Sequence, residues 1–131
     1  MADFVIIDTD ILIDFGLDRK DAVETLAKLE DQFDLKVSVI TALELYAGCR
    51  SKRDLNSVDD LLLHFSVEHL SKNISELSFN LMREFRSSHG VEINDMLIAA
   101  TALYSEAKFI SKNQKHYRFL PNLDLFPYPF L

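Results

Sequence analysis

The sequence predicts an α/β protein of three layers, with helices on both faces of a mostly parallel central sheet. Short apolar runs alternate along the chain with longer stretches in which apolar residues recur at helical spacing. Polar or turn-forming residues bound each apolar run, as is typical of strand ends. Such alternation favours a parallel sheet that is covered on both faces.

Four short apolar runs are expected to form the buried strands. The first is FVII at residues 4–7, and the second is KVSVI at residues 36–40. Two more, AKFI at residues 107–110 and LDLF at residues 123–126, follow late in the chain. Their length and continuous apolar character are typical of strands inside a sheet.

Two helices with clear N-cap residues are expected in the first half of the chain. Residues 19–33 form one, with Asp18 as the N-cap. Residues 52–65 form the next, with Ser51 as the N-cap. The apolar residues of the first helix recur at helical spacing: Val23, Leu26, Leu29 and Phe33.

The second half is expected to hold two further helices. One extends from Ser71 to Ser88 and is stopped by Gly90, with Leu77, Leu81 and Phe85 on one face. Asn94 is expected to open the other, over residues 95–107. That helix carries small residues that permit close packing against a neighbour: Ala99, Ala100 and Ala102.

Length and composition limit the class of protein. A chain of 131 residues with 48% hydrophobic residues fits one compact domain over residues 1–131. No membrane-spanning run and no basic signal-peptide start is visible, so we expect a soluble, cytoplasmic protein. Cys49 is the only cysteine, which excludes an intrachain disulfide and a cysteine-rich zinc site. The net charge of −7 does not favour nucleic-acid binding by the molecule as a whole.

Asp8 directly follows the first apolar run, at the point where an open α/β sheet binds its ligands. Asp10 and Asp14 lie in the next turns of the chain. A helix-capping role would explain Asp8 but would leave Asp10 unexplained, and Asp14 is expected to be solvated. A functional role for Asp8 and Asp10 is therefore the preferred interpretation.

Glu44 and Asp95 are two further acids in mostly apolar surroundings. Glu44 lies in the predicted helix ITALELYAG, and a carboxylate that faces the sheet there needs a partner. Asp95 lies in a first helical turn, where an acid that merely complements the helix dipole is the alternative. If these two carboxylates converged with Asp8, the three would repel one another unless a cation neutralised them. Oxygen ligands favour Mg²⁺ or Mn²⁺ over zinc, and such an ion suits phosphodiester hydrolysis.

Four sequence blocks occur in an order that points to a known family. They are VIIDTDILID with Asp8 and Thr9, VSVITALELYAG with Glu44, INDMLIAATAL with Asp95, and KFISKNQKHY with Ser111 and Asn113. With these blocks the sequence resembles the PIN-domain family over nearly its whole length. Within that family it is similar to the VapC toxins of type II toxin–antitoxin pairs.

The resemblance implies an endoribonuclease that depends on Mg²⁺ or Mn²⁺, forms a homodimer and has an antitoxin protein as partner. It implies that four residues are catalytic, of which the three acids bind the metal: Asp8, Glu44, Asp95 and Asn113. It implies supporting roles for Thr9, Asp10 and Ser111. Asn113 stands where many relatives have a fourth acid, and Asp10 stands where asparagine is frequent. One firmly bound ion is favoured, and a second stays open.

Residues 107–123 contain no acidic residue and are the candidate RNA-binding segment. Lys112, Lys115 and Arg118 are its candidate phosphate contacts, interleaved with aromatic residues that suit single-stranded RNA. The alternative places these aromatic side chains in the core, and for Phe109 this alternative is preferred. The histidines have no ligand-like spacing and are assigned no chemistry.

Two other functions stay open at this stage. IIDTDIL also resembles the first motif of haloacid-dehalogenase-type phosphatases, with Asp8 as nucleophile and Asp10 as acid/base. That interpretation leaves Glu44 and Asp95 without a role. A degenerate PIN domain that binds RNA or protein without cutting is the second alternative, supported by Asn113. The tail LDLFPYPFL is expected to pack on its own domain, with a dimer contact as the alternative.

Overall fold

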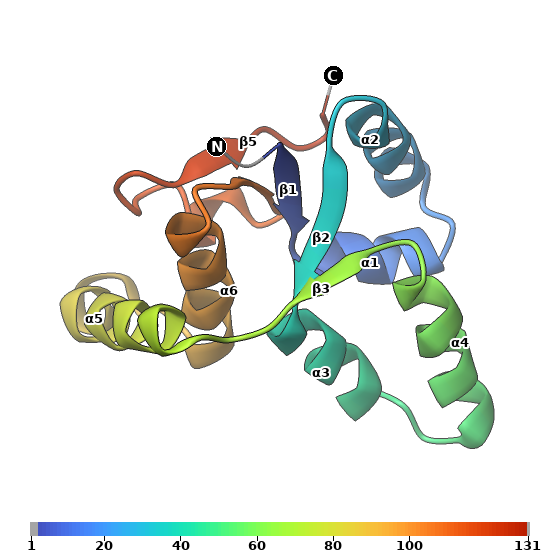
Figure 1. Ribbon diagram of the computed structural model, residues 1–131, viewed down its shortest axis with the longest axis horizontal. Coiled ribbons are helices and arrows are strands. Elements are labelled where there is room, and N and C mark those ends of the chain that lie inside the picture. Colours follow the sequence, from blue (N-terminus) through green and yellow to red (C-terminus); the bar gives the residue numbers. More distant parts are fainter. Residues whose placement is uncertain (1–2, 131) are drawn as a thin grey trace.

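The computed structural model describes residues 3–130 and contains a parallel sheet of five strands (Figure 1). Its spatial order is β3-β2-β1-β4-β5, and every neighbouring pair is parallel. The central strand β1 therefore has a hydrogen-bonded neighbour on each side. The strands are β1 (Phe4–Ile7), β2 (Asp34–Ser38), β3 (Ser66–Glu68), β4 (Lys108–Ile110) and β5 (Asp124–Phe126).

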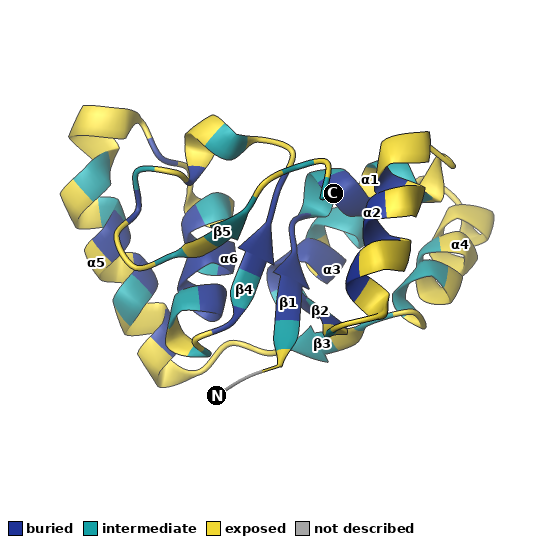
Figure 2. Cartoon of the chain, turned by 90° about the horizontal axis from the view of Figure 1, so that it is seen from above, coloured by how far each residue is buried: buried dark blue, intermediate teal, exposed yellow. Residues whose placement is uncertain are grey.

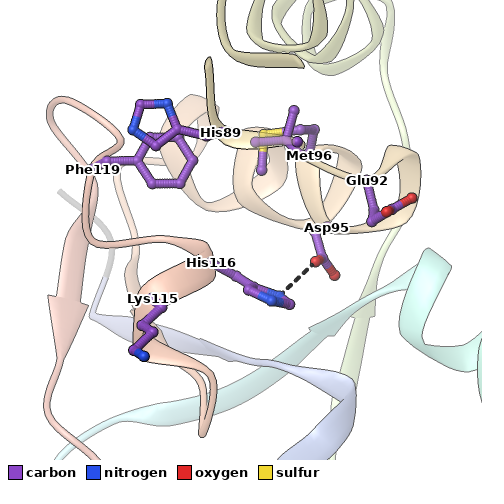
Figure 3. A pocket seen from close by; sticks show the side chains of 9 residues that line it. His89, Glu92, Asp95, Met96, Lys115, His116 and Phe119 are labelled. Carbon is purple, nitrogen blue, oxygen red and sulfur yellow. Dashed lines mark hydrogen bonds and ion pairs between the residues drawn. The ribbon is translucent and has the colours of Figure 1, made fainter. Parts of the chain in front are cut away.

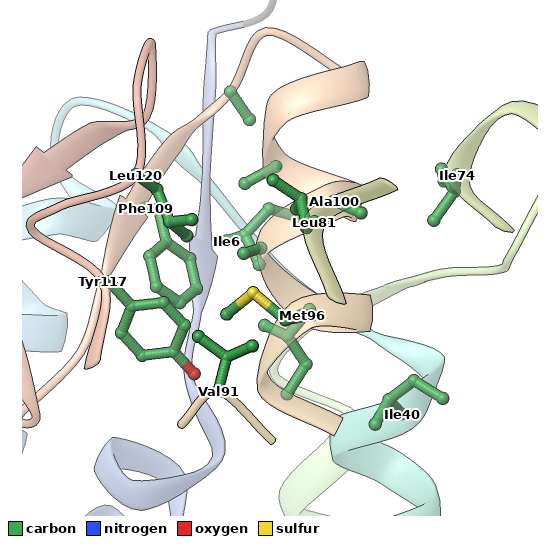
Figure 4. Close-up of a cluster of buried hydrophobic side chains, with 14 residues drawn as sticks. Ile6, Ile40, Ile74, Leu81, Val91, Met96, Ala100, Phe109, Tyr117 and Leu120 are labelled. Carbon is green, nitrogen blue, oxygen red and sulfur yellow. The ribbon is translucent and has the colours of Figure 1, made fainter. Parts of the chain in front are cut away.

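Helices pack on both faces of this sheet. The side chain of Ile6 points into an apolar cluster with α5 and α6, shown in Figure 4. Val5 and Ile7 point into a second cluster with α1 and α2, as expected from the alternation of side chains along a strand. Figure 2 shows the resulting burial of β1 and β4. The helices are α1 (Thr9–Gly16), α2 (Lys20–Glu30), α3 (Val39–Ala47), α4 (Lys52–Leu62), α5 (Lys72–His89) and α6 (Ile93–Tyr104), with a short 3₁₀ helix, η1, at Gln114–His116.

The predicted three-layer class is confirmed, with corrections to individual strands. The second predicted strand was placed too late, because Ser38 ends β2 and its hydroxyl accepts a hydrogen bond from the Ile40 N–H at the start of α3. Strand β3, an edge strand of three residues, was not predicted. Such a short strand carries little periodic signal, and its pairing with β2 defines it.

The helix boundaries with local capping signals are confirmed. The Ser51 and Ser71 hydroxyls accept hydrogen bonds from the Asp54 and Ile74 N–H groups, and Gly90 ends α5 in the left-handed conformation. The Asp18 prediction is wrong, since Arg19 occupies the N-cap of α2 without a side-chain bond.

Two other helix predictions are also wrong. Asn94 lies inside the first turn of α6 rather than at its cap, which Glu92 occupies. Val23 is exposed, because Ala22, Leu26 and Leu29 form the buried face of α2. The spacing thus identified the helix and its buried residues Leu26 and Leu29, but it included Val23 in place of Ala22.

The C-terminal segment packs on its own domain, as preferred from the sequence. The rings of Phe126 and Phe130 stack at 5.1 Å, and the Phe130 N–H donates to Thr25 Oγ1 in α2. Across residues 3–130, no helix is both long enough and apolar enough to cross a membrane.

Candidate functional site

Asp8 lies at the carboxyl end of β1, directly before α1, and is the buried centre of the candidate site. Its side chain is 5% exposed. Oδ1 accepts a hydrogen bond from the Thr9 N–H at 2.9 Å, and Oδ2 accepts one from Ser111 Oγ at 2.7 Å. Asp8 therefore caps α1 and is also tied to the residue that follows β4. The parallel pairing of β1 with β4 brings these two strand ends together.

Burial makes the charge on Asp8 unfavourable. It raises the pKa of this carboxyl from 3.8 to about 7, and the negative charge of Asp10 adds to the effect. The hydrogen bonds from Ser111 and Thr9 oppose the shift, and Asp95 adds a smaller increase. A carboxylate in this environment favours the arrival of a positive charge.

Asp10 lies on the same side of the site as Ser111. Its Oδ2 accepts from Ser111 Oγ at 3.3 Å, its Oδ1 accepts from the Lys112 N–H at 3.4 Å, and burial raises its pKa. Asp14, which was expected to be solvated, instead pairs with Lys112 Nζ at 2.6 Å. This ion pair connects α1 to the segment after β4.

Glu44 is held by side chains from two other helices. Thr9 Oγ1 donates to Glu44 Oε1 at 2.7 Å and lies 2.8 Å from Thr41 Oγ1. Asn94 Nδ2 donates to Glu44 Oε2 at 3.3 Å. Thr9 thus contacts Asp8 through its backbone and Glu44 through its hydroxyl. Asn94 was not predicted to belong to this network, because its contact with Glu44 joins α6 to α3 and leaves no local signal in the sequence.

Asp95 lies in the first turn of α6 and pairs with His116. Nδ1 of His116 and Oδ2 of Asp95 are 3.2 Å apart, and Figure 3 shows the two side chains pointing toward each other. The histidines were assigned no chemistry from their spacing in the sequence, and the structure places one of them, His116, in contact with Asp95. Spacing in the sequence could not reveal this residue, since a lone partner of a carboxylate has no motif.

Asn113 occupies the turn between β4 and η1 and is exposed. Its backbone N–H donates to Ser111 Oγ at 3.0 Å. Ser111 therefore accepts from Asn113 while it donates to Asp8, which fixes the direction of the Asp8 contact. A catalytic role for the Asn113 side chain stays a prediction.

The PIN domain matches residues 5–119. This chain belongs to the PIN-domain family. Ribonuclease VapC19 of Mycobacterium tuberculosis is 30% identical over 120 residues, which are 90% of this chain and 95% of the relative. Ribonuclease VapC10 of the same species is 29% identical over 114 residues, 86% of this chain and 85% of the relative.

Solved structures with the same fold include two toxin–antitoxin assemblies. A toxin–antitoxin complex from Klebsiella pneumoniae has a TM-score of 0.76 and 26% identity, covering 96% of this PIN domain and 98% of that chain. VapBC2 from Rickettsia felis, bound to a promoter DNA fragment, has a TM-score of 0.80 and 23% identity, covering 93% and 96%. The PIN fold explains why strand ends and helix starts gather the acids at one edge of the sheet.

A cavity of about 130 Å³ lies beside Asp95 in this PIN domain (Figure 3). Asp95 and His116 form part of its wall, and Lys115 adds a positive charge. His89 and Phe119 line it as a stacked pair, with ring centroids 3.9 Å apart. An anionic ligand at the acids would therefore have a basic and aromatic surface next to it.

The candidate RNA-binding segment, residues 107–123, differs in the structure from what the sequence predicted. Phe109 and Tyr117 are fully buried and pack edge to face at 4.8 Å, so they cannot stack on RNA bases. Lys112 is already paired with Asp14. Lys115 and Arg118 are exposed. The alternative that the aromatic residues enter the core is thus confirmed for Phe109 and Tyr117.

The donors of the site fit a divalent cation such as Mg²⁺ or Mn²⁺. Among residues 3–130, no three His, Cys, Asp or Glu side chains converge closely enough to hold a metal ion by themselves. Thr9 instead connects two of the acids, since its N–H donates to Asp8 and its hydroxyl donates to Glu44. The third acid, Asp95, acts on Asp8 through its negative charge, which raises the pKa of Asp8. Mg²⁺ suits such a site, because it commonly binds one or two carboxylates and keeps several waters.

Proposed function

We propose that this PIN domain is an endoribonuclease that depends on Mg²⁺ or Mn²⁺, and that it is the toxin of a toxin–antitoxin pair. The observation that carries the proposal is the buried carboxylate of Asp8, tied to Thr9, Ser111 and, through Thr9, to Glu44. Its raised pKa means that the site favours a cation at neutral pH. The ribonuclease relatives support the choice of RNA as substrate.

Asp8, Glu44 and Asp95 would hold the cation together with bound waters, since the three carboxylates do not converge closely enough to hold it by themselves. A bound divalent ion polarises a phosphoryl group and lowers the pKa of a coordinated water, which are the needs of phosphodiester hydrolysis. Ser111 and Thr9 orient Asp8, Thr9 and Asn94 orient Glu44, and His116 orients Asp95. Each carboxylate is thus already oriented, so the site loses less conformational entropy when a ligand binds. Asn113 and Asp10 are further polar groups at the edge of this set.

Lys115 and Arg118 would contact the RNA backbone. Both side chains are exposed, and Lys115 lines the cavity beside Asp95. A protein of net charge −7 needs such local positive charge to hold phosphates. Lys112 is a weaker candidate, because its ammonium is engaged with Asp14.

The proposed partners are a second copy of the chain and an antitoxin protein. The complex from Klebsiella pneumoniae supports an antitoxin. An apolar groove between α5 and α6, with Phe79 and Ile93 exposed, supports the homodimer, because apolar surface of this kind is stabilised by burial. We assign this groove to the dimer contact.

The decisive experiment compares the cutting of a structured RNA pool by the wild type and by Asp8→Asn, each with Mg²⁺, Mn²⁺ or EDTA. Asp31→Asn is the matched control, because Asp31 is exposed at the end of α2. We expect metal-dependent internal cuts by the wild type and by the control, and none by Asp8→Asn. A folded wild type that binds RNA without cutting it would establish the degenerate, non-catalytic PIN domain instead.

Toxin activity is tested by expression in a bacterial host. Induction of the wild type is expected to arrest growth, whereas induction of Asp8→Asn at equal protein level is not. Equal growth of both strains would refute the toxin assignment and leave the ribonuclease assignment to the RNA assay. The phosphatase alternative loses its support, because the chain belongs to the PIN-domain family.

A further inference from the structure

Tyr117 is a buried residue whose hydroxyl has no partner. Its side chain is fully buried, and its ring packs against Phe109 in the cluster drawn in Figure 4. Within residues 3–130, only Tyr117 and Tyr128 have a buried side-chain oxygen or nitrogen without a hydrogen-bond partner. Burial of an unbonded hydroxyl is unfavourable, so packing alone would be served better by phenylalanine.

The hydroxyl lies close to the acidic site. Tyr117 directly follows His116, the residue that contacts Asp95. Figure 4 shows the Tyr117 oxygen at the end of the cluster where Val91 and Met96 lie, and Met96 is the neighbour of Asp95 in α6. Burial raises the pKa of Tyr117 strongly, and the charges of Asp8 and Asp95 raise it further. The group is therefore a neutral donor beside two carboxylates.

We propose that the Tyr117 hydroxyl is a positioning group of the acidic site. It donates a hydrogen bond to the carboxylate of Asp8 or Asp95 and so orients that carboxylate toward the divalent cation. The proposal rests on the proposed metal-dependent function. The buried O–H has no acceptor of its own, and Tyr117 directly follows His116, whose ring nitrogen lies 3.2 Å from Asp95 Oδ2. A shift of either carboxylate on cation binding would bring it within reach of this donor.

The role is tested with the cation alone. Titration calorimetry with Mn²⁺, on protein freed of metal by EDTA and dialysis, compares the wild type with Tyr117→Phe and Tyr128→Phe. The control is matched, because Tyr128 also has an orphaned buried hydroxyl but packs in the cluster on the other face of the sheet. We expect Tyr117→Phe to bind Mn²⁺ about 10- to 100-fold more weakly, as for other residues that orient metal ligands. Tyr128→Phe should bind within threefold of the wild type.

Two results would overturn the role of Tyr117. One is Mn²⁺ binding by folded Tyr117→Phe within threefold of the wild type. The other is an equal loss in both variants, which would indicate a general effect of removing a buried hydroxyl. Because packing is preserved, Tyr117→Phe should not lower the melting temperature of the metal-free protein.

A second measurement keeps the hydroxyl of Tyr117 in place. 3-Fluorotyrosine placed at position 117 reports on its surroundings by fluorine NMR, and Mg²⁺ is the diamagnetic probe. We expect the resonance at 117 to shift on Mg²⁺ binding and one at position 104, an exposed tyrosine, to stay unchanged. A silent resonance at 117 in protein that binds Mg²⁺ would also overturn the role.

Failure of this inference differs from failure of the proposed function. If the wild type cuts RNA with Mn²⁺ and Tyr117→Phe matches it in ion affinity and in kcat, only the positioning role is lost. If the wild type neither binds Mn²⁺ nor cuts RNA, the metal-dependent function fails and the inference fails with it.

Discussion

Ser111 Oγ lies 2.7 Å from Asp8 Oδ2, a contact between residues 103 positions apart that joins the ends of two neighbouring strands. Ser111 is fully buried and also accepts from the Asn113 N–H. It has therefore a fixed orientation and can donate only toward the acids. Several predictions about the site depend on this arrangement of a buried carboxylate and its donors.

Asp8 makes the stability of the metal-free protein depend on pH. Its folded pKa of about 7 exceeds the unfolded value of 3.8, so the folded state binds the proton more tightly. The resulting stabilisation is present below about pH 4, is lost as pH rises toward 7, and amounts to about 4 kcal/mol at most. In EDTA, the unfolding free energy of Asp8→Asn should fall less between pH 4.5 and pH 8 than that of the wild type. At pH 8, Asp8→Asn should be the more stable of the two proteins. Denaturant unfolding from pH 4.5 to 8 measures both. Identical pH profiles for the two proteins would contradict the prediction.

Ser111→Ala should weaken both the fold and the site. The substitution removes a donor to Asp8 and an acceptor for the Asn113 N–H, at a cost of about 1–3 kcal/mol in unfolding free energy. Metal affinity and RNA cutting should fall about 10- to 100-fold, because Asp8 loses its orientation. Ser57→Ala, at an exposed serine that bonds within α4, is the control. Unchanged cutting by folded Ser111→Ala would show that Asp8 does not need this contact.

Thr9→Val should separate Glu44 from Asp8 without disturbing the helix start. The variant keeps the backbone N–H that donates to Asp8 and loses the hydroxyl, which donates to Glu44 Oε1 and contacts Thr41 Oγ1. We expect weaker Mn²⁺ binding and a lower kcat, again by about 10-fold or more. Thr101→Val is the matched control, since it removes a hydroxyl that bonds only within α6. Equal kinetics in both variants would remove Thr9 from the supporting network.

Lys115→Ala should affect RNA binding and leave the cation site intact. Lys115 is exposed at the cavity beside Asp95, and within residues 3–130 it forms no ion pair. Loss of one phosphate contact should reduce the slope of log K for RNA binding against log salt concentration by about 1. Fluorescence anisotropy measures this binding, with the Asp8→Asn substitution present in every protein so that the RNA is not cut. Lys20→Ala, in the exposed first turn of α2, should have no effect. An unaltered salt slope for Lys115→Ala would exclude this lysine from the RNA contact.

Phe79→Asp should convert the proposed homodimer to a monomer. Phe79 is 68% exposed on α5 and lines the apolar groove toward α6, where a buried charge would be unfavourable. Sedimentation velocity measures the oligomeric state, and circular dichroism verifies the fold. Leu63→Asp, at an exposed leucine after α4, is the control that should leave the dimer intact. A dimer that survives Phe79→Asp would locate the contact elsewhere.

The sequence by itself determined the elements with strong local signals. The apolar run before Asp8 predicts a strand that ends at that residue, and Ser51, Ser71 and Gly90 mark helix ends through bonds and backbone conformations set by nearby residues. The four acidic and polar blocks predicted the PIN family for the same reason, because each lies within a short segment.

The tertiary structure alone decided which residues complete the site. Asn94 reaches Glu44 across 50 positions, Thr9 reaches it across 35, and His116 reaches Asp95 across 21. Strand β3 and the burial of Tyr117 likewise depend on pairing and packing between distant segments. Local propensity and periodicity carry no information about such contacts, because they form only when the parallel sheet brings the strand ends and helix starts to one edge.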